Sequence, residues 1–151
     1  MTLSMRMAFY GVALGLIALD QATKWWARVG LASMSVDWGI LRLDLVFNKG
    51  AAYGLFHSYG GVLMIIGVIV SGYLAVMIPR LAKKRWEYGG YMFLLAGAIG
   101  NTMDRAIAGR VTDFINIHII PVFNIADVYL NIGFGLLIGQ WVLDYRQKNR
   151  D

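Results

Sequence analysis

Apolar residues fall into four long runs along the chain, and each run ends at charged or aromatic residues. We predict helices over about residues 6–27, 60–79, 87–106 and 122–143. Each is close to the ~20 residues that an α-helix needs to cross the ~30 Å apolar core of a bilayer. The second run has no charged residue before Pro79, which is typical of a helix end. The pattern predicts one integral-membrane domain over residues 1–151, with connecting outer segments 28–59 and 107–121.

Both outer segments contain a second pattern, in which alternate residues share a character. One face of segment 40–47 carries Leu41, Leu43, Leu45 and Phe47, and one face of the other carries Val111, Asp113, Ile115, Ile117 and Ile119. A period of two residues indicates β-strands. Unpaired strands cannot lie in lipid, because their backbone groups would lack partners. The expected fold is an all-α membrane protein, a four-transmembrane-helix bundle with a small extracytoplasmic β-sheet at the outer interface.

The composition agrees with a membrane protein and excludes several kinds of functional site. Hydrophobic residues make up 58% of the chain and charged residues 15%, against about 25% charged in soluble domains. With no cysteine, disulfides, thiolate catalysis and cysteine metal sites are excluded. His57 and His118 share no metal-ligand spacing, so we expect no metal and no cofactor.

The net charge of +5 could indicate a nucleic-acid partner, but the basic residues gather at the ends of apolar runs. There they indicate contact with membrane lipid and not with nucleic acid. The densest cluster, Arg80, Lys83, Lys84 and Arg85, predicts that the connection between the second and third helices is cytoplasmic. Four spans then place both termini in the cytoplasm as well. A cleavable signal peptide is the alternative for the first run, but Asp20 interrupts its pattern and no cleavage site follows.

Asp113 and Asp127 are the most informative residues, because nearly everything around them is apolar. A carboxylate within a membrane helix costs about 2.5–3.5 kcal/mol, so it is a functional candidate by default. Two neighbouring carboxylates share one proton, and together they can activate a water and protonate a leaving group. Helical spacing gives Asn101, Asp104 and Arg105 a common face, and it puts Asn124, Asp127 and Asn131 on one stripe. Interhelical hydrogen bonding could explain one or two of the amides but explains this many carboxylates poorly.

Five sequence blocks along the chain carry a resemblance to a known family. They are Asp20–Lys24, Asn48–Gly54, Gly97–Arg105, Gly109–Phe114 and Phe123–Asp127. In this order they resemble the five blocks of bacterial lipoprotein signal peptidase, the type II signal peptidase. The resemblance implies an aspartic endopeptidase of the bacterial inner membrane, with its active site near the outer face. Its substrate would be a prolipoprotein, cleaved before the diacylglyceryl-modified cysteine, and globomycin-type inhibitors would bind it.

The resemblance also implies roles for single residues. Asp113 and Asp127 match the family's catalytic pair. The matching positions that support the site or contact substrate are Asp20, Asn48, Gly50, Asn101, Asp104, Arg105 and Asn124. Ala96 and Tyr53 depart mildly from the family's pattern, which leaves the fine substrate preference open.

Other functions remain as alternatives. A small proton-coupled transporter or channel could use an Asp/Asn/Arg relay, although the chain has no detectable inverted repeat and its polar groups gather toward the outer side. A Ser/Lys protease would have to combine Ser33 or Ser35 with Lys24 or Lys49, and no motif fixes that geometry. The GxGD block of presenilin-like proteases is absent.

Overall fold

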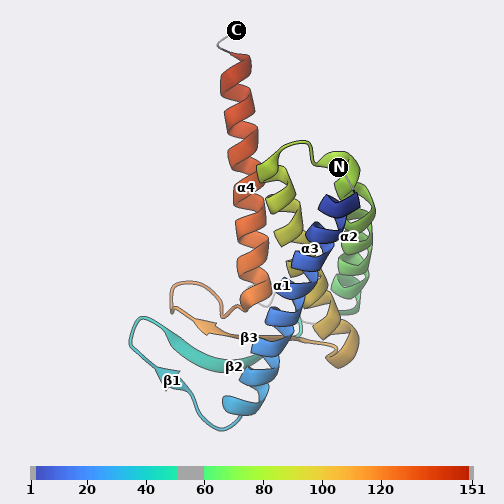
Figure 1. The fold of residues 1–151 in the computed structure, drawn as a ribbon. Helices are drawn as coiled ribbons and strands as arrows, with labels where there is room; N and C mark the ends of the chain where they lie inside the picture. The colour runs from blue at the N-terminus through green and yellow to red at the C-terminus, as the bar shows by residue number, and fades with distance from the viewer. Residues whose placement is uncertain (1–2, 51–59, 150–151) are drawn as a thin grey trace.

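The structure is a computed structural model, and it describes residues 3–50 and 60–149. Its helices there are α1 (Leu3–Gly30), α2 (Gly60–Leu81), α3 (Arg85–Ala108) and α4 (Ile125–Lys148), and its strands are β1 (Val36–Asp37), β2 (Arg42–Asn48) and β3 (Val111–Asn116). The helices stand side by side, and the sheet lies across the end of the bundle where α1 and α3 finish and α4 begins (Figure 1). Helix α3 packs against each of the other helices. The prediction of a mostly helical chain with a small sheet is confirmed.

The sheet is antiparallel, with strand order β1-β2-β3. Strand β2 lies in the segment that alternation predicted, whereas β1 has only two residues and is too short to show a period. At the far end of β2, Val46 pairs with Asp113 and Asn48 pairs with Val111. This register carries the side chain of Asn48 to the carboxylate of Asp113.

Strand β3 ends earlier than the predicted alternation, which ran to Ile119. The Asn116 side chain accepts a hydrogen bond from the backbone N–H of His118 at 2.9 Å, and His118 has a φ of 64°. An Asx-type turn of this kind takes the chain out of the sheet. Phe123 then returns to pair with Ile115. The turn directs the chain back from β3 to the start of α4.

Helix α4 begins at Ile125, three residues later than about 122. Asn124 is its N-cap: the Asn124 Oδ1 accepts the N–H of Asp127 at 3.1 Å, and the Asp127 Oδ2 accepts the N–H of Asn124 at 3.1 Å. This reciprocal capping box fixes where the helix starts. The predicted stripe is therefore wrong for Asn124, which lies outside the helix. Asn131 lies one turn after Asp127, is exposed and donates to the backbone oxygen of Asp127.

Two of the helices, α2 and α4, are long and apolar enough to cross a membrane by length and composition alone. Their apolar stretches have mean hydropathies of 2.5 for 61–78 and 1.3 for 125–148. Helices α1 and α3 are of similar length but carry the buried ions Asp20, Lys24 and Asp104. Composition alone thus identifies only two of the four predicted spans.

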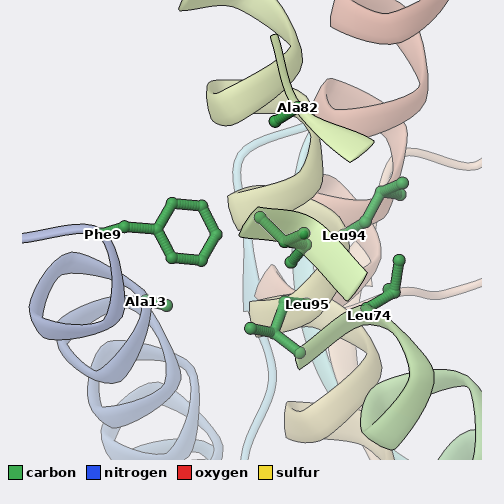
Figure 2. Close-up of a cluster of buried hydrophobic side chains, with 7 residues drawn as sticks. Phe9, Ala13, Leu74, Ala82, Leu94 and Leu95 are labelled. Atoms are coloured by element: carbon green, nitrogen blue, oxygen red, sulfur yellow. The ribbon is translucent and has the colours of Figure 1, made fainter. Parts of the chain in front are cut away.

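The main apolar core lies where α1, α2 and α3 meet, toward the end of the bundle away from the sheet. Figure 2 shows the side chains of this cluster facing one another from these helices. Its buried members are Phe9, Ala13, Leu74, Ile78, Ala82, Leu94 and Leu95. These contacts fix the bundle and leave its opposite end free to hold polar groups.

Glycines allow α3 to pack closely against α4 and against α1. A Cβ added to Gly97 would lie 2.5 Å from the backbone oxygen of Ala126, and one added to Gly100 would lie 2.5 Å from the carboxylate of Asp20. The packing interpretation of these two glycines is correct. It is wrong for the Gly135 and Gly139 pair, because a Cβ at either would meet nothing within 4 Å.

Gly133→Ala should destabilise the fold. The added Cβ would lie 2.7 Å from Leu94 Cγ and 2.8 Å from the backbone oxygen of Gly90. Overpacking of this kind costs about 1–3 kcal/mol, which exceeds the gain of about 1 kcal/mol from replacing a helical glycine by alanine. Thermal unfolding in detergent should show a lower midpoint. Gly135→Ala, on the open face of the same helix, is the matched control and should leave the midpoint unchanged or raise it.

Candidate active site

A cavity of about 230 Å³ opens between the sheet and the start of α4. Its lining comes from the ends of β2, β3 and α3, the chain before α4 and the first turn of α4: Asn48, Gly50, Arg105, Asp113, Pro121, Val122, Phe123 and Asp127. A larger hollow of about 340 Å³, beside Trp86 and Leu143, is lined almost entirely by apolar surface. The smaller cavity is the candidate site, because it brings together the two carboxylates of Asp113 and Asp127.

Asp113 is held on β3 by amide donors on both sides. Asn48 Nδ2 donates to its Oδ2 at 3.0 Å, and Asn124 Nδ2 donates to its Oδ1 at 2.6 Å. Burial raises the pKa of Asp113 from 3.8 to about 6; the two amide hydrogen bonds oppose this rise, and the charge of Asp127 adds to it. A carboxyl with such a pKa can exchange a proton near neutral pH.

Asp127 lies in the first turn of α4 and also accepts on both oxygens. Asn101 Nδ2 donates to its Oδ1 at 2.8 Å, and the backbone N–H of Asn124 donates to its Oδ2. The capping contact fixes the side chain at the positive end of the helix, where a negative charge is stabilised. Its carboxylate is thereby aimed from α4 into the cavity that Asp113 lines from β3.

Two asparagine side chains connect the carboxylates. Asn124 Nδ2 donates to Asn101 Oδ1 at 3.2 Å as well as to Asp113, and Asn101 in turn donates to Asp127. Asn124 is fully buried and Asn101 nearly so. The network thus joins Asp113 and Asp127 through two buried amides.

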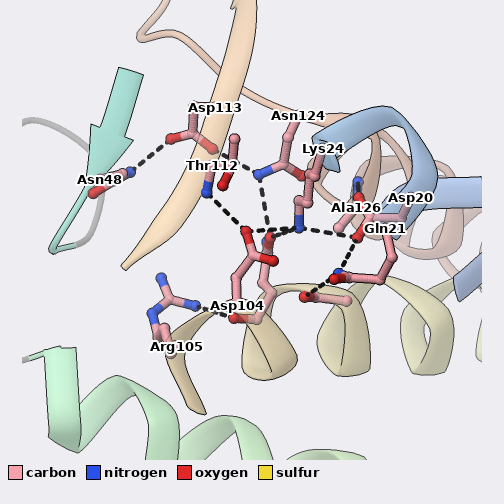
Figure 3. Close-up of polar contacts among 12 residues, drawn as sticks. Asp20, Gln21, Lys24, Asn48, Asp104, Arg105, Thr112, Asp113, Asn124 and Ala126 are labelled. Carbon is pink, nitrogen blue, oxygen red and sulfur yellow. Dashed lines mark hydrogen bonds and ion pairs between the residues drawn. The ribbon is translucent and has the colours of Figure 1, made fainter. Parts of the chain in front are cut away.

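A buried ion cluster lies behind the amides (Figure 3). Lys24 Nζ is 2.9 Å from Asp20 Oδ2 and 3.7 Å from Asp104 Oδ2, and the side chains of Lys24 and Asp20 have no exposed surface. Asp20 Oδ1 accepts the N–H of Ala126 at 2.9 Å, and Asp104 Oδ2 accepts the N–H of Thr112 at 2.8 Å. The cluster therefore ties α1 and α3 to the residues just before Asp113 and Asp127.

Arg105 brings a positive charge to the cavity. Its hydrogen bonds to the backbone oxygens of Asn101 and Gly50 are long, at 3.4 and 3.5 Å. Its Nε is buried and has no partner among the described residues. The guanidinium therefore keeps donor capacity beside the two carboxylates.

The nine residues predicted from the sequence all lie in or behind this cavity. Asp113, Asp127, Asn48, Gly50 and Arg105 line it, Asn101 and Asn124 bind the carboxylates, and Asp20 and Asp104 belong to the ion cluster. Tyr53, Gly54 and His57 lie outside the described residues. The Ser/Lys alternative loses support, because Lys24 is buried against acids and amides while Ser33 and Ser35 are exposed.

The network has other members that the sequence motifs did not indicate as site residues. Lys24 bonds Asn101, and Arg28 donates to the Thr112 hydroxyl at 2.9 Å. Gln21 donates to Asp20 and to the backbone oxygen of Gly100. The spacing of Asp20 and Lys24, one helical turn apart in an apolar run, could have indicated a buried ion pair.

Comparison with known proteins identifies the family. The model of the family described as signal peptidase (SPase) II matches residues 12–143. The chain belongs to the signal peptidase II family. The resemblance inferred from the five sequence blocks is thereby confirmed, and the chain is a member of a peptidase family.

Named relatives and a solved structure agree with this family. A lipoprotein signal peptidase from Cyanothece sp. is 41% identical over 143 residues, covering 88% of this chain and 83% of the relative. One from Halalkalibacterium halodurans is 35% identical over 156 residues, covering 96% and 98%. The solved structure of a bacterial membrane enzyme superposes with a TM-score of 0.83 at 29% identity, covering 97% of this chain and 92% of that one. The similarity therefore extends over nearly the whole chain.

The raised pKa of Asp113 gives a stability signature with a definite sign. Between pH 3.8 and about 6 the folded chain holds a proton that the unfolded chain has lost. The stabilisation from this group is therefore complete below pH 3.8 and is lost as pH rises to about 6. The unfolding free energy, relative to that of Asp113→Asn, should fall by at most about 1.4 kcal/mol per pH unit across this window. Chemical denaturation in detergent at a series of pH values measures it, and a flat difference would contradict the raised pKa.

Proposed function

We propose that the protein is an intramembrane aspartic endopeptidase that removes the signal peptide from prolipoproteins, with Asp113 and Asp127 as its catalytic residues. The observation that carries this proposal is the convergence of the two carboxylates on one cavity, each held by buried amide donors. Membership of the signal peptidase II family supplies the substrate class. Cleavage would fall before the diacylglyceryl-modified cysteine, as the resemblance implies.

The chemistry follows from one proton shared by two acids. Burial raises the pKa of Asp113, so we assign the proton to Asp113 and the negative charge to Asp127 when substrate binds. Asp127 takes a proton from a water, whose oxygen forms a bond to the scissile carbonyl carbon, while Asp113 donates a hydrogen bond to the carbonyl oxygen. The carbon–nitrogen bond then breaks as a proton reaches the leaving amine. The products are a carboxylate on the signal peptide and a free amine on the lipidated cysteine.

We assign Arg105 and Gly50 to substrate contact. Arg105 retains unused donors at the cavity wall, and these can bind a peptide carbonyl oxygen. Gly50 donates its N–H to Asn48 Oδ1 at 3.0 Å, which also orients the Asn48 amide toward Asp113. Globomycin-type inhibitors, implied by the family resemblance, would occupy the same cavity in place of the peptide.

The proposed setting is the bacterial inner membrane, crossed by all four helices. The outward surfaces of the helices support lipid contact, since they expose large apolar side chains, among them Leu14, Leu19, Ile65, Ile69, Val76, Phe134 and Ile138. Three charged residues of α1 and α3, Asp20, Lys24 and Asp104, are buried and paired with one another. Such pairing is what makes ions tolerable within a membrane span.

Charge and aromatic residues support the orientation. Basic side chains gather at the end of the bundle away from the sheet, on Lys83, Lys84, Arg85, Arg146 and Lys148. We place that end, with both termini, in the cytoplasm. Trp25 and Trp26 lie on the last turns of α1, beside the sheet, and are substantially exposed, as in an interfacial aromatic belt. The cavity then lies near the outer face, where the diacylglyceryl chains can lie among the helices.

Asp113→Asn and Asp127→Asn should each abolish cleavage of a purified, lipidated prolipoprotein while leaving the fold intact. An amide in place of either carboxylate removes the shared proton chemistry, and a loss of at least about 10³-fold is expected for a group that acts in the chemical step. Asp37→Asn, at an exposed position of strand β1, is the matched control and should cleave normally. Full cleavage by either cavity variant would refute the assignment. Proton or solute flux without cleavage by the wild type would support the transporter alternative.

Cysteine labelling tests the orientation directly, because the chain contains no cysteine of its own. A cysteine at exposed Lys83, between α2 and α3, should react with an impermeant maleimide only when the cytoplasmic side is open. A cysteine at exposed Ser35, next to β1, should react in intact spheroplasts. The reverse pattern would overturn the proposed topology while leaving the catalytic assignment untouched.

A further inference from the structure

Lys24 is fully buried and does not line the cavity, yet it contacts the network that holds the carboxylates. Its ammonium donates to Asn101 Oδ1 at 2.9 Å. It is also paired with Asp20 at 2.9 Å and lies 3.7 Å from Asp104. Burying an ammonium is costly unless it is paired and hydrogen-bonded. The contact with Asn101 is the one through which Lys24 reaches Asp127.

The Asn101 amide has two orientations, and its neighbours permit only one. Its Oδ1 accepts from Lys24 Nζ and from Asn124 Nδ2, and its Nδ2 donates to Asp127 Oδ1 at 2.8 Å. Rotation of the amide by half a turn would place an N–H₂ against two donors and an oxygen against a carboxylate. An amide is oriented by the hydrogen bonds that surround it, and the ammonium is the strongest donor facing Asn101.

We propose that Lys24 is a positioning residue that orients the Asn101 amide so that its N–H donates to the carboxylate of Asp127. The proposal rests on the catalytic role assigned to Asp127 above. Lys24 itself contacts neither the cavity nor the reacting atoms. Its effect is transmitted from α1 through a single amide on α3 to the first turn of α4.

The hydrogen bond from Asn101 stabilises the ionised form of Asp127. The charged and titratable groups that act on the same site are Asp113 from β3, Arg105 and Asp104 from α3, and Lys24 from α1. A flipped or mobile Asn101 would no longer hold the Asp127 carboxylate in place or stabilise its ionised form. A smaller fraction of the enzyme would then have the ionised base at low pH, so the acid limb of the pH–rate profile would move to higher pH. Substrate binding would change little, because the cavity lining is not altered. The expected signature is a lower kcat with a nearly constant KM.

The test separates this role from simple stabilisation. Lys24→Met alone would leave Asp20 without its cation, so the experiment uses charge-matched double variants. Asp20→Asn with Lys24→Met removes both charges and the donor to Asn101. Asp20→Asn with Lys24→Gln removes the same charges and keeps an N–H donor on a side chain of nearly the same length as Met. Asn at position 20 can still accept the N–H of Ala126.

Unfolding midpoints, kcat, KM and pH–rate profiles are measured on full-length protein in detergent, with Asp20→Asn as the baseline. We expect similar midpoints for the two double variants, but a kcat at least about tenfold lower for the Met variant, in line with the loss of an orienting partner. Its acid limb should lie at higher pH, and KM should be unchanged. Equal kcat in the two double variants would overturn the proposal, as would a loss confined to KM. Unfolding of the Met variant alone would assign Lys24 to stability and would also overturn it.

The outcome is distinguishable from failure of the proposed function. Asp113→Asn and Asp127→Asn are assayed beside the double variants. Cleavage by either single variant would refute the assignment of the catalytic pair itself, whatever the kcat of the Lys24 variants. If Asp113→Asn and Asp127→Asn both abolish cleavage while the two double variants have equal kcat, only the proposed role of Lys24 is refuted.

Discussion

The need to satisfy buried carboxylates governs the arrangement of this protein. Asp20, Asp104 and Asp113 have almost no exposed surface, and each would be costly without a cation or hydrogen-bond donor. The chain supplies one ammonium, Lys24, and a set of amide and backbone N–H groups. Because the carboxylates and their donors together lie on α1, α3, β3 and the start of α4, satisfying the charges fixes how these elements meet. The fold and the site are therefore held by the same contacts.

The need to satisfy buried carboxylates explains which parts of the fold and the site could be predicted from the sequence. Asp113 and Asp127 were conspicuous because ionisable residues in apolar segments are rare, and the strands around residues 42–48 and 111–116 showed a period of two. The role of Lys24 was not visible, because it depends on a contact with Asn101 across 77 positions of sequence. Spacing on an ideal helix also misled for Asn124, since it takes no account of the cap that places this residue before the start of α4.

The same buried charges lower the mean hydropathy of α1 and α3. A scale that adds residues one at a time counts Asp20 and Lys24 as two penalties, although the pair is buried and mutually neutralised. The outward surface of α1 remains apolar, with Leu14 and Leu19 exposed. The charged residues of the buried cluster, Asp20, Lys24 and Asp104, lie on α1 and α3, whereas residues 61–78 of α2 have a mean hydropathy of 2.5. The lower hydropathy thus belongs to the two helices that hold the buried ion cluster, whereas α4 carries Asp127 and is still apolar enough to cross a membrane.

Two glycines of α3 also make room for the contacts around the buried carboxylates. Gly100 makes room for the carboxylate of Asp20, and Gly97 lets the backbone of α4 approach at Ala126, whose N–H binds Asp20. Close approach of α3 to α4 is thus required for Asn101 to reach Asp127. Farther along α4, Gly135 and Gly139 face open space, beyond the reach of the polar network. The close contact between Gly97 and Ala126 therefore lies beside the point where the Asn101 amide crosses from α3 to Asp127 on α4. Backbone packing and the geometry of the carboxylate pair are linked at this point.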